Sequence, residues 1–182
     1  CHLLIERNIC LSFKIHLRAE NVLRYSQEDL AVMKSAGVDV IICGLESGSQ
    51  QELSFFRKLA SKKQGLAAFS HLEESGSFCN ILGYMMFTPV TTVEILEEKV
   101  GFLRQLTRGW DFLNLTNRLL VIWGTVIHRQ LIDLGLAEDG DFHAGYVPFK
   151  YKDAKVLRVD EFFNTLKRQR PEIVRLNNLM YD

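Results

Sequence analysis

Residues 38–49 read VDVIICGLESGS, a nearly all-apolar, β-branched run that ends in a short polar loop. Such a run is typical of a strand covered on both faces, as in parallel sheets, and it predicts a buried strand at 38–45. The loop places Glu46 directly after that strand. A carboxylate in this position must either find partners or project into a cavity, so Glu46 is the foremost candidate for a functional side chain.

Three further segments have the pattern of strands. Residues 11–17 alternate apolar and polar side chains, residues 79–87 are mostly apolar, and residues 112–122 carry polar side chains at alternate positions. Helical patterns separate the segments. This alternation of strands and helices predicts an α/β fold with a parallel sheet and right-handed crossovers.

Helix-start signals support this pattern. Ser26 precedes acidic residues, which favours the N-terminus of a helix there. Ser61 with Gln64, and Thr91 with Glu94, have the spacing of a capping box, in which the first side chain caps the helix. We therefore expect Thr91 to cap the helix that follows the strand at 79–87.

Composition and charge exclude several classes of protein. The chain has 182 residues, of which 47% are hydrophobic and 24% charged, and this excludes a disordered chain or a disulfide scaffold. With 22 basic and 22 acidic side chains the formal net charge is zero. This balance does not indicate nucleic acid or a membrane surface as a partner. No apolar run approaches the roughly 20 residues that span a bilayer.

The cysteines are scattered. No two of Cys1, Cys10, Cys43 and Cys79 lie two or three residues apart, as the ligands of a zinc or iron–sulfur site normally do, so no metal site is predicted. Cys43 and Cys79 lie in apolar runs and are expected to be buried. Free cysteines without a visible signal peptide favour a reducing, cytoplasmic location.

Ligands of parallel α/β sheets bind beyond the carboxyl ends of the strands, which yields a short set of candidate residues. The set comprises Arg18, Glu46, Ser47, Gly48, Thr88, Asn117, Arg118 and Trp123. A guanidinium at a strand end can clamp a carboxylate. Structural roles are open alternatives for both charged residues. Glu46 would cap the next helix or pair with Arg18, and Arg18 would pair with Glu20 or with Glu46.

Several stretches, in this order and at this spacing, resemble the later strands and turns of the barrel in radical S-adenosylmethionine (radical SAM) enzymes. They lie within residues 10–136, at 18–22, 34–38, 44–50, 86–92 and 117–120. The closest subgroup is the cobalamin-binding radical SAM proteins. The resemblance implies a partial TIM-like (βα) barrel with parallel strands near 11–17, 38–45, 79–87 and 112–122.

The resemblance also implies cofactors and roles. In such enzymes a [4Fe–4S] cluster reduces S-adenosylmethionine (SAM), and the resulting 5′-deoxyadenosyl radical takes a hydrogen atom from the substrate. By this resemblance Glu46 accepts hydrogen bonds from the ribose hydroxyls or the amino group of SAM. Arg18 holds the cofactor or an acidic neighbour, and Pro89 with its turn lines the adenine side. Cobalamin is a further cofactor that the subgroup allows.

The sequence departs from the family in two ways. The cluster motif Cys-x3-Cys-x2-Cys and the first two barrel strands are absent, and Val90 stands where the family often has glycine. The chain thus resembles the carboxyl-terminal two-thirds of the barrel, and no cofactor is expected on it alone. The expected partners are the missing N-terminal barrel segment, a small-molecule substrate of unknown identity, or a second copy paired through the edge strand at 11–17.

The predicted domains are a partial barrel at 1–136 and a loop-and-helix extension at 137–182, with Asp160 as the cap of its last helical region. The predicted function is that of a fragment of a radical SAM enzyme. Two alternatives stay open, a non-catalytic scaffold half-barrel and an unrelated TIM-barrel lyase fragment. A lyase of the Schiff-base type needs a lysine on a strand, and Lys14 is the only strand lysine.

Overall fold

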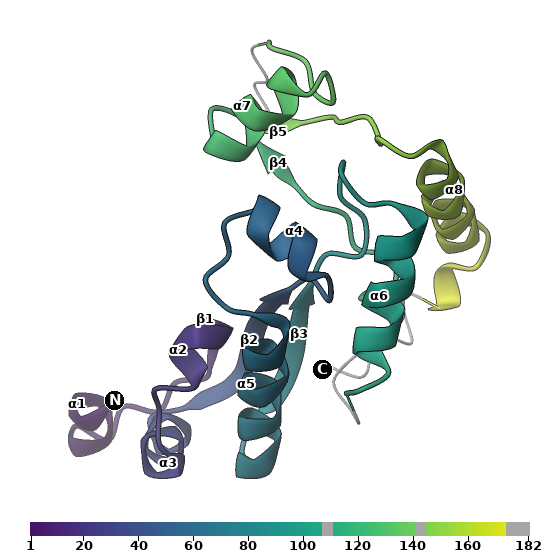
Figure 1. Ribbon diagram of the computed structural model, residues 1–182. Helices are drawn as coiled ribbons and strands as arrows, with labels where there is room; N and C mark the ends of the chain where they lie inside the picture. Colours follow the sequence, from purple (N-terminus) through teal and green to yellow (C-terminus); the bar gives the residue numbers. More distant parts are fainter. Residues whose placement is uncertain (107–110, 141–144, 174–182) are drawn as a thin grey trace.

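A three-stranded parallel sheet forms the centre of the computed structural model, which describes residues 1–106, 111–140 and 145–173. Strand β2 (Val38–Glu46) lies in the middle, between β1 (Phe13–Arg18) and β3 (Cys79–Tyr84). Both pairings are parallel, as the sequence predicts. The carboxyl ends of the three strands therefore meet at one edge of the sheet (Figure 1).

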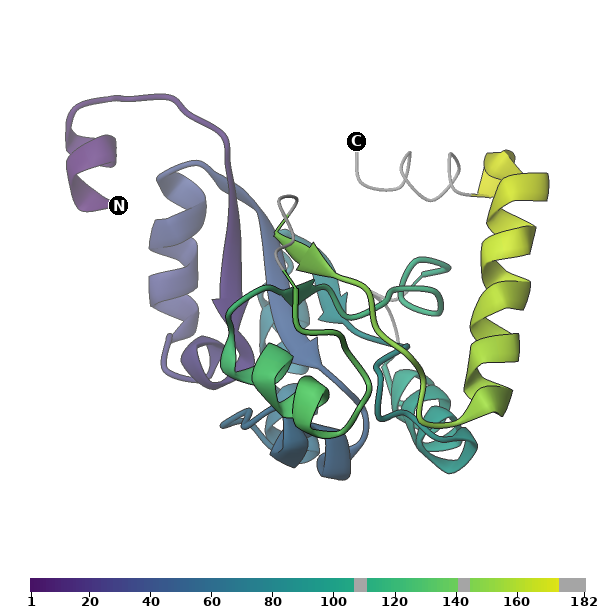
Figure 2. The ribbon, with the colours of Figure 1, turned by 90° about the horizontal axis from the view of Figure 1, so that it is seen from above.

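Helices cover one face of this sheet (Figures 1 and 2). Those that contact β2 are α2 (Ala19–Val22), α3 (Gln27–Ser35) and α5 (Lys62–Ser75). Their apolar side chains bury the alternate β2 residues Ile41 and Cys43, which are fully inaccessible to solvent. The opposite face of the sheet, which includes Ile42 and Gly44, is only half-buried in the described structure.

Apart from α1, which lies near the opposite end of the sheet, the remaining elements lie beyond the carboxyl edge of the sheet or to one side of it (Figure 1). Beyond the carboxyl ends lie α7 and a small antiparallel pair, and α6 and α8 lie to the side of β3 (Figures 1 and 2). Their bounds, with those of the N-terminal helix and the helix after β2, are α1 (His2–Glu6), α4 (Gln50–Phe55), α6 (Val93–Leu103), β4 (Val121–Ile122), α7 (Val126–Asp133), β5 (Tyr146–Val147) and α8 (Ala154–Gln169).

Two of the expected helix caps are confirmed and two are wrong. Ser26 caps α3 and Ser61 caps α5, each in a complete capping box. Helix α6 is capped by Thr92, not by Thr91, because the Thr91 hydroxyl is buried and bound to other side chains. Asp160 lies inside α8, where it is 1% exposed, and Asp153 is the cap of that helix.

The expected strand at 112–122 is wrong. Residues 112–116 form turns, because short polar side chains bind the local backbone: the Asn114 side chain accepts a hydrogen bond from the Asp111 amide, and the Thr116 hydroxyl donates to the Phe112 carbonyl. Within the described part of the chain, Phe87 and Arg118 form a single parallel bridge, and the last two residues of the predicted range, Val121–Ile122, form β4, which pairs with β5 and not with the central sheet. The strand expected at 79–87 likewise ends at Tyr84.

The cysteines follow the prediction in part. Cys43 is buried, and burial raises the pKa of its thiol to about 12, with the charges of Glu46 and Glu20 acting in the same direction. Cys79 is only partly buried, because it opens β3 on the less covered face of the sheet. Among the described residues, no helix combines the length and the hydropathy that a membrane crossing requires.

Candidate functional site

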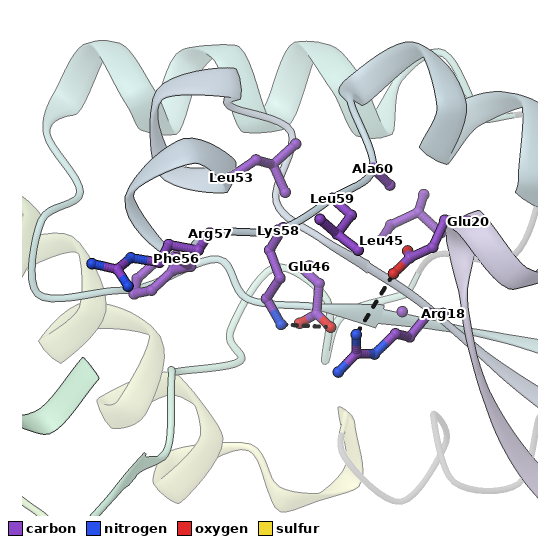
Figure 3. A pocket seen from close by; sticks show the side chains of 11 residues that line it. Arg18, Glu20, Leu45, Glu46, Leu53, Phe56, Arg57, Lys58, Leu59 and Ala60 are labelled. Carbon is purple, nitrogen blue, oxygen red and sulfur yellow. Dashed lines mark ion pairs between the residues drawn. The ribbon is translucent and has the colours of Figure 1, made fainter. Parts of the chain in front are cut away.

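A small pocket lies at the carboxyl ends of β1 and β2, beneath the loop that joins α4 to α5 (Figure 3). Its volume is about 140 Å³. Charged side chains line it together with apolar ones, and the lining residues are Arg18, Glu20, Gly44, Leu45, Glu46, Leu53, Phe56, Arg57, Lys58, Leu59 and Ala60. The position beyond the strand ends is the one expected for a ligand site in a parallel α/β sheet.

Glu46 ends β2 in an unusual backbone conformation. Its φ is +67°, in the left-handed region that non-glycine residues rarely adopt. The Ser47 amide donates to the Leu45 carbonyl at 2.8 Å, which closes a three-residue turn with Glu46 at its centre. Strain of this kind persists only where the surroundings hold it, and it is frequent at functional sites.

Two ion pairs cross the pocket (Figure 3). The Glu46 carboxylate lies 3.1 Å from the Lys58 ammonium, and Arg18 lies 3.7 Å from the carboxylate of Glu20. The structure therefore brings Arg18 and Glu46 into one pocket, but each is paired with a different neighbour. Both pairs are partly exposed, so they contribute little to stability and can exchange for a ligand.

Ser47 and Gly48 follow Glu46 but do not line the pocket. The Ser47 side chain is 1% exposed and its hydroxyl donates to the Glu52 carboxylate at 2.7 Å. Gly48 packs against α6: a Cβ placed on it would lie 2.5 Å from the Phe102 Cβ and from the Tyr84 hydroxyl. Ser47 and Gly48 thus hold the loop after β2 against α4 and α6, on the side away from the pocket.

Pro89 and Asn117, which were also predicted as site residues, lie outside the pocket as well. Pro89 is buried, and its carbonyl accepts a hydrogen bond from the Lys152 amide at 2.9 Å. The carbonyl of Asn117 accepts from the amides of Met86 and Phe87, each at 3.0 Å. In the described structure these residues fix the chain that follows β3.

A buried charged cluster lies next to the Glu46 turn, and Thr88 is the only one of its members that the sequence indicated as a candidate. The ammonium of Lys99 is 2.5 Å from the carboxylate of Glu52, and both side chains are fully buried. The hydroxyls of Thr88 and Thr91 donate to the other oxygen of that carboxylate at 2.8 and 2.5 Å. Burial lowers the pKa of Lys99 to about 8, while the charge of Glu52 opposes this shift.

One sequence signal would have found this cluster. Lys99 lies three residues after Leu96 and four before Leu103, so it falls on the apolar stripe of its helix. A lysine there needs a buried acceptor. Nothing in the local sequence of Glu52 identifies it as that acceptor.

Substitution of Gly48 by alanine tests the packing behind the site. We expect Gly48→Ala to lower the free energy of unfolding by about 1–3 kcal/mol, because the added methyl overlaps Phe102 and Tyr84. Urea unfolding followed by circular dichroism measures this. Gly101→Ala is the matched control: a Cβ there meets no atom of the described chain within 4 Å, and alanine favours a helix. Equal stabilities of the two variants would contradict the packing described for Gly48.

The residues present do not fit an iron–sulfur cluster. Within residues 1–106, 111–140 and 145–173, no three side chains of His, Cys, Asp or Glu come together as metal ligands. They fit part of a nucleoside better, because Glu46 and Glu20 offer acceptors for hydroxyl groups and Arg18 offers donors beside them.

The fold has counterparts among solved structures. Three structures of OxsB, described as a cobalamin-dependent S-adenosylmethionine radical enzyme, match 93% of this chain at 19% identity. The fold of this chain is therefore similar to that of part of OxsB. The TM-scores are 0.75 with aqua-cobalamin bound to OxsB, 0.74 with aqua-cobalamin and SAM bound, and 0.73 for the apo protein. This chain spans 31% of the length of OxsB in the first two. No protein-family model and no curated protein matches the sequence.

Proposed function

We propose that this chain forms part of the SAM-binding barrel of a radical SAM enzyme. The fold shared with OxsB supports this proposal, since that protein binds SAM and cobalamin. The observation that carries it further is Glu46, a strained carboxylate at the carboxyl end of the central strand that projects into a pocket. We infer no substrate.

In this proposal the residues of the pocket bind and orient the cofactor. Glu46 exchanges Lys58 for the ribose hydroxyls or the amino group of SAM, and Arg18 steadies the cofactor or Glu20. Ser47 and Gly48 hold the Glu46 turn. With one electron from the reduced cluster, bound SAM would supply the group that removes a hydrogen atom from a substrate.

The part of the barrel beyond β3 has a supporting role in the same proposal. Pro89 and Asn117 fix the chain on the adenine side of the cofactor through their backbone carbonyls. The cluster ligands must lie outside residues 1–182, because the cysteines of this chain are scattered. Cobalamin is a further cofactor of the whole protein in this proposal, and no residue of this chain is assigned to it.

The free edge of β1 is the proposed site of association. In the described structure β1 pairs with β2 alone, so the backbone groups of its other edge have no strand beside them. Lys14 and His16 are the polar side chains that blunt this edge. A partial barrel with an open β1 edge would be completed by the N-terminal strands of the barrel or by a second copy.

Glu46→Ala tests the proposed function. Hydrogen bonds to a charged group contribute roughly 1.5–3 kcal/mol, so the loss of the carboxylate should weaken SAM binding by roughly 10- to 150-fold. Glu46→Gln should lose only part of this affinity. The measurement is a SAM titration of the full-length protein that contains this chain, loaded with its cluster.

Iron content is the control for this titration. It should be the same in the wild type and both variants, because no cluster ligand is assigned to this chain. If the wild type and the Glu46 variants bind SAM equally well at equal iron content, the proposed function of Glu46 is wrong. Its role would then be structural, as the partner of Lys58.

A further inference from the structure

The buried Glu52–Lys99 pair needs an explanation beyond stability. Burying two charges costs more solvation energy than a well-packed apolar pair, and replacement of such pairs by apolar residues is often neutral or stabilising. Here both side chains are fully buried, and they come from two different helices, α4 and α6. Unlike a pair of leucines, this pair binds specific polar groups of the chain.

The polar groups that the pair binds lie on both sides of Glu46. On one side, the Glu52 carboxylate accepts the hydroxyl of Ser47, the residue that follows Glu46. On the other side, the Lys99 ammonium donates to the Met86 carbonyl at 2.9 Å, and the amide of the preceding Met85 donates to the Glu46 carbonyl at 2.8 Å.

These contacts enclose the strained turn. The φ of +67° at Glu46 is unfavourable for a residue with a side chain, so the turn requires restraint from its neighbours. Ser47 is held by Glu52, the chain at residues 85–86 is held by Lys99, and the ion pair locks the two restraints together.

We infer that the buried pair of Glu52 and Lys99 is a positioning device for Glu46. It holds the turn from both sides and so directs the Glu46 carboxylate into the pocket, toward a ligand that carries adjacent hydroxyl groups. This inference rests on the proposed function, because it concerns the same carboxylate. Glu52 and Lys99 do not line the pocket and touch no ligand there.

Ser47→Ala removes the hydroxyl that donates to Glu52 and accepts from the Ser49 amide at 3.1 Å, and it leaves the ion pair in place. We expect SAM affinity of the cluster-loaded, full-length protein to fall roughly tenfold, which is about the value of the hydrogen bond from Ser47 to Glu52. Ser49→Ala is the matched control: Ser49 is also fully buried, but its hydroxyl has no hydrogen-bond partner among the described residues. SAM affinity should not change in that variant.

Combination with Glu46→Ala separates positioning from a general structural effect. If Ser47 acts through Glu46, Ser47→Ala should cause no further loss of SAM affinity once Glu46→Ala is present. An equal loss with and without Glu46→Ala would overturn the inference. So would an unchanged affinity in Ser47→Ala while Glu46→Ala weakens binding. If Glu46→Ala itself leaves the affinity unchanged, the proposed function fails instead.

A second readout needs no ligand. In Glu52→Leu/Lys99→Met, which loses both restraints, the amides of Ser47 and Met85 should exchange hydrogen at least roughly tenfold faster, as resolved by NMR. Amides of β1, remote from the turn, should keep their rates. Unchanged protection of the Ser47 and Met85 amides would overturn the inference.

Discussion

Lys99→Met should destabilise the protein by about 3–5 kcal/mol, the largest loss of stability that we expect from one substitution. The substitution leaves the fully buried Glu52 carboxylate without its counter-charge, and the Met86 carbonyl without a donor. Urea unfolding at pH 7 is the measurement. The ammonium of Lys99 is the counter-charge that the substitution removes, since it lies 2.5 Å from the Glu52 carboxylate.

The double variant Glu52→Gln/Lys99→Met is the control for that prediction. It removes both charges and keeps an amide that can bond to Ser47, Thr88 and Thr91. We expect it to regain more than half of the stability that Lys99→Met loses. If the single substitution costs less than about 1 kcal/mol, the typical value of an exposed pair, the burial described for this pair is wrong.

Asp160→Ala should have the second-largest effect, a loss of about 2–4 kcal/mol. Asp160 is 1% exposed and accepts hydrogen bonds from Arg118 at 2.9 Å, from the Tyr151 hydroxyl at 2.6 Å and from Asn164 at 2.9 Å. The loss comes mainly from the Tyr151 hydroxyl, because a buried donor left without its acceptor costs roughly 1–3 kcal/mol. Arg118 is partly exposed and regains water in the variant, and Asn164 keeps its bond to the Asp160 backbone carbonyl.

Glu161→Ala is the matched control, since Glu161 is the next residue of α8 and is exposed. Its unfolding free energy should stay within about 0.5 kcal/mol of the wild type. Similar stabilities of Asp160→Ala and Glu161→Ala would show that Asp160 does not anchor α8 to Arg118.

Local patterns in the sequence were sufficient for the central elements. The apolar run at 38–45 predicts β2 because a strand buried among neighbours needs few polar positions. Ser26 and Ser61 predict helix starts because a cap depends on residues only three positions away. Glu46 was found as the candidate site residue for a similar reason, since its place after β2 follows from the position of that strand.

Contacts between distant segments could not be read in the same way. Thr91 and Glu94 have the spacing of a capping box, but Glu52, 39 positions before Thr91, binds the Thr91 hydroxyl, and Thr92 caps the helix instead. Asp160 resembles a helix cap in sequence, yet it accepts Arg118 from 42 positions away. Spacing along the sequence identifies neither Glu52 as the partner of Thr91 nor Arg118 as the partner of Asp160.

The error at 112–122 has a different cause. Alternating polar residues there have the period of a half-covered strand. Short side chains such as Asn114 and Thr116 can also bind the nearby backbone, and in the structure this local bonding prevails. Periodicity alone does not distinguish the two outcomes.

Formation of 5′-deoxyadenosine is the measurement that tests the central proposal most directly. The full-length protein that contains this chain, loaded with its cluster under anaerobic conditions and reduced, should convert SAM to 5′-deoxyadenosine, as detected by liquid chromatography and mass spectrometry. Glu46→Ala should reduce this product at SAM concentrations below saturation. A protein with a complete cluster that forms no 5′-deoxyadenosine from SAM would contradict the assignment of this chain to a radical SAM barrel.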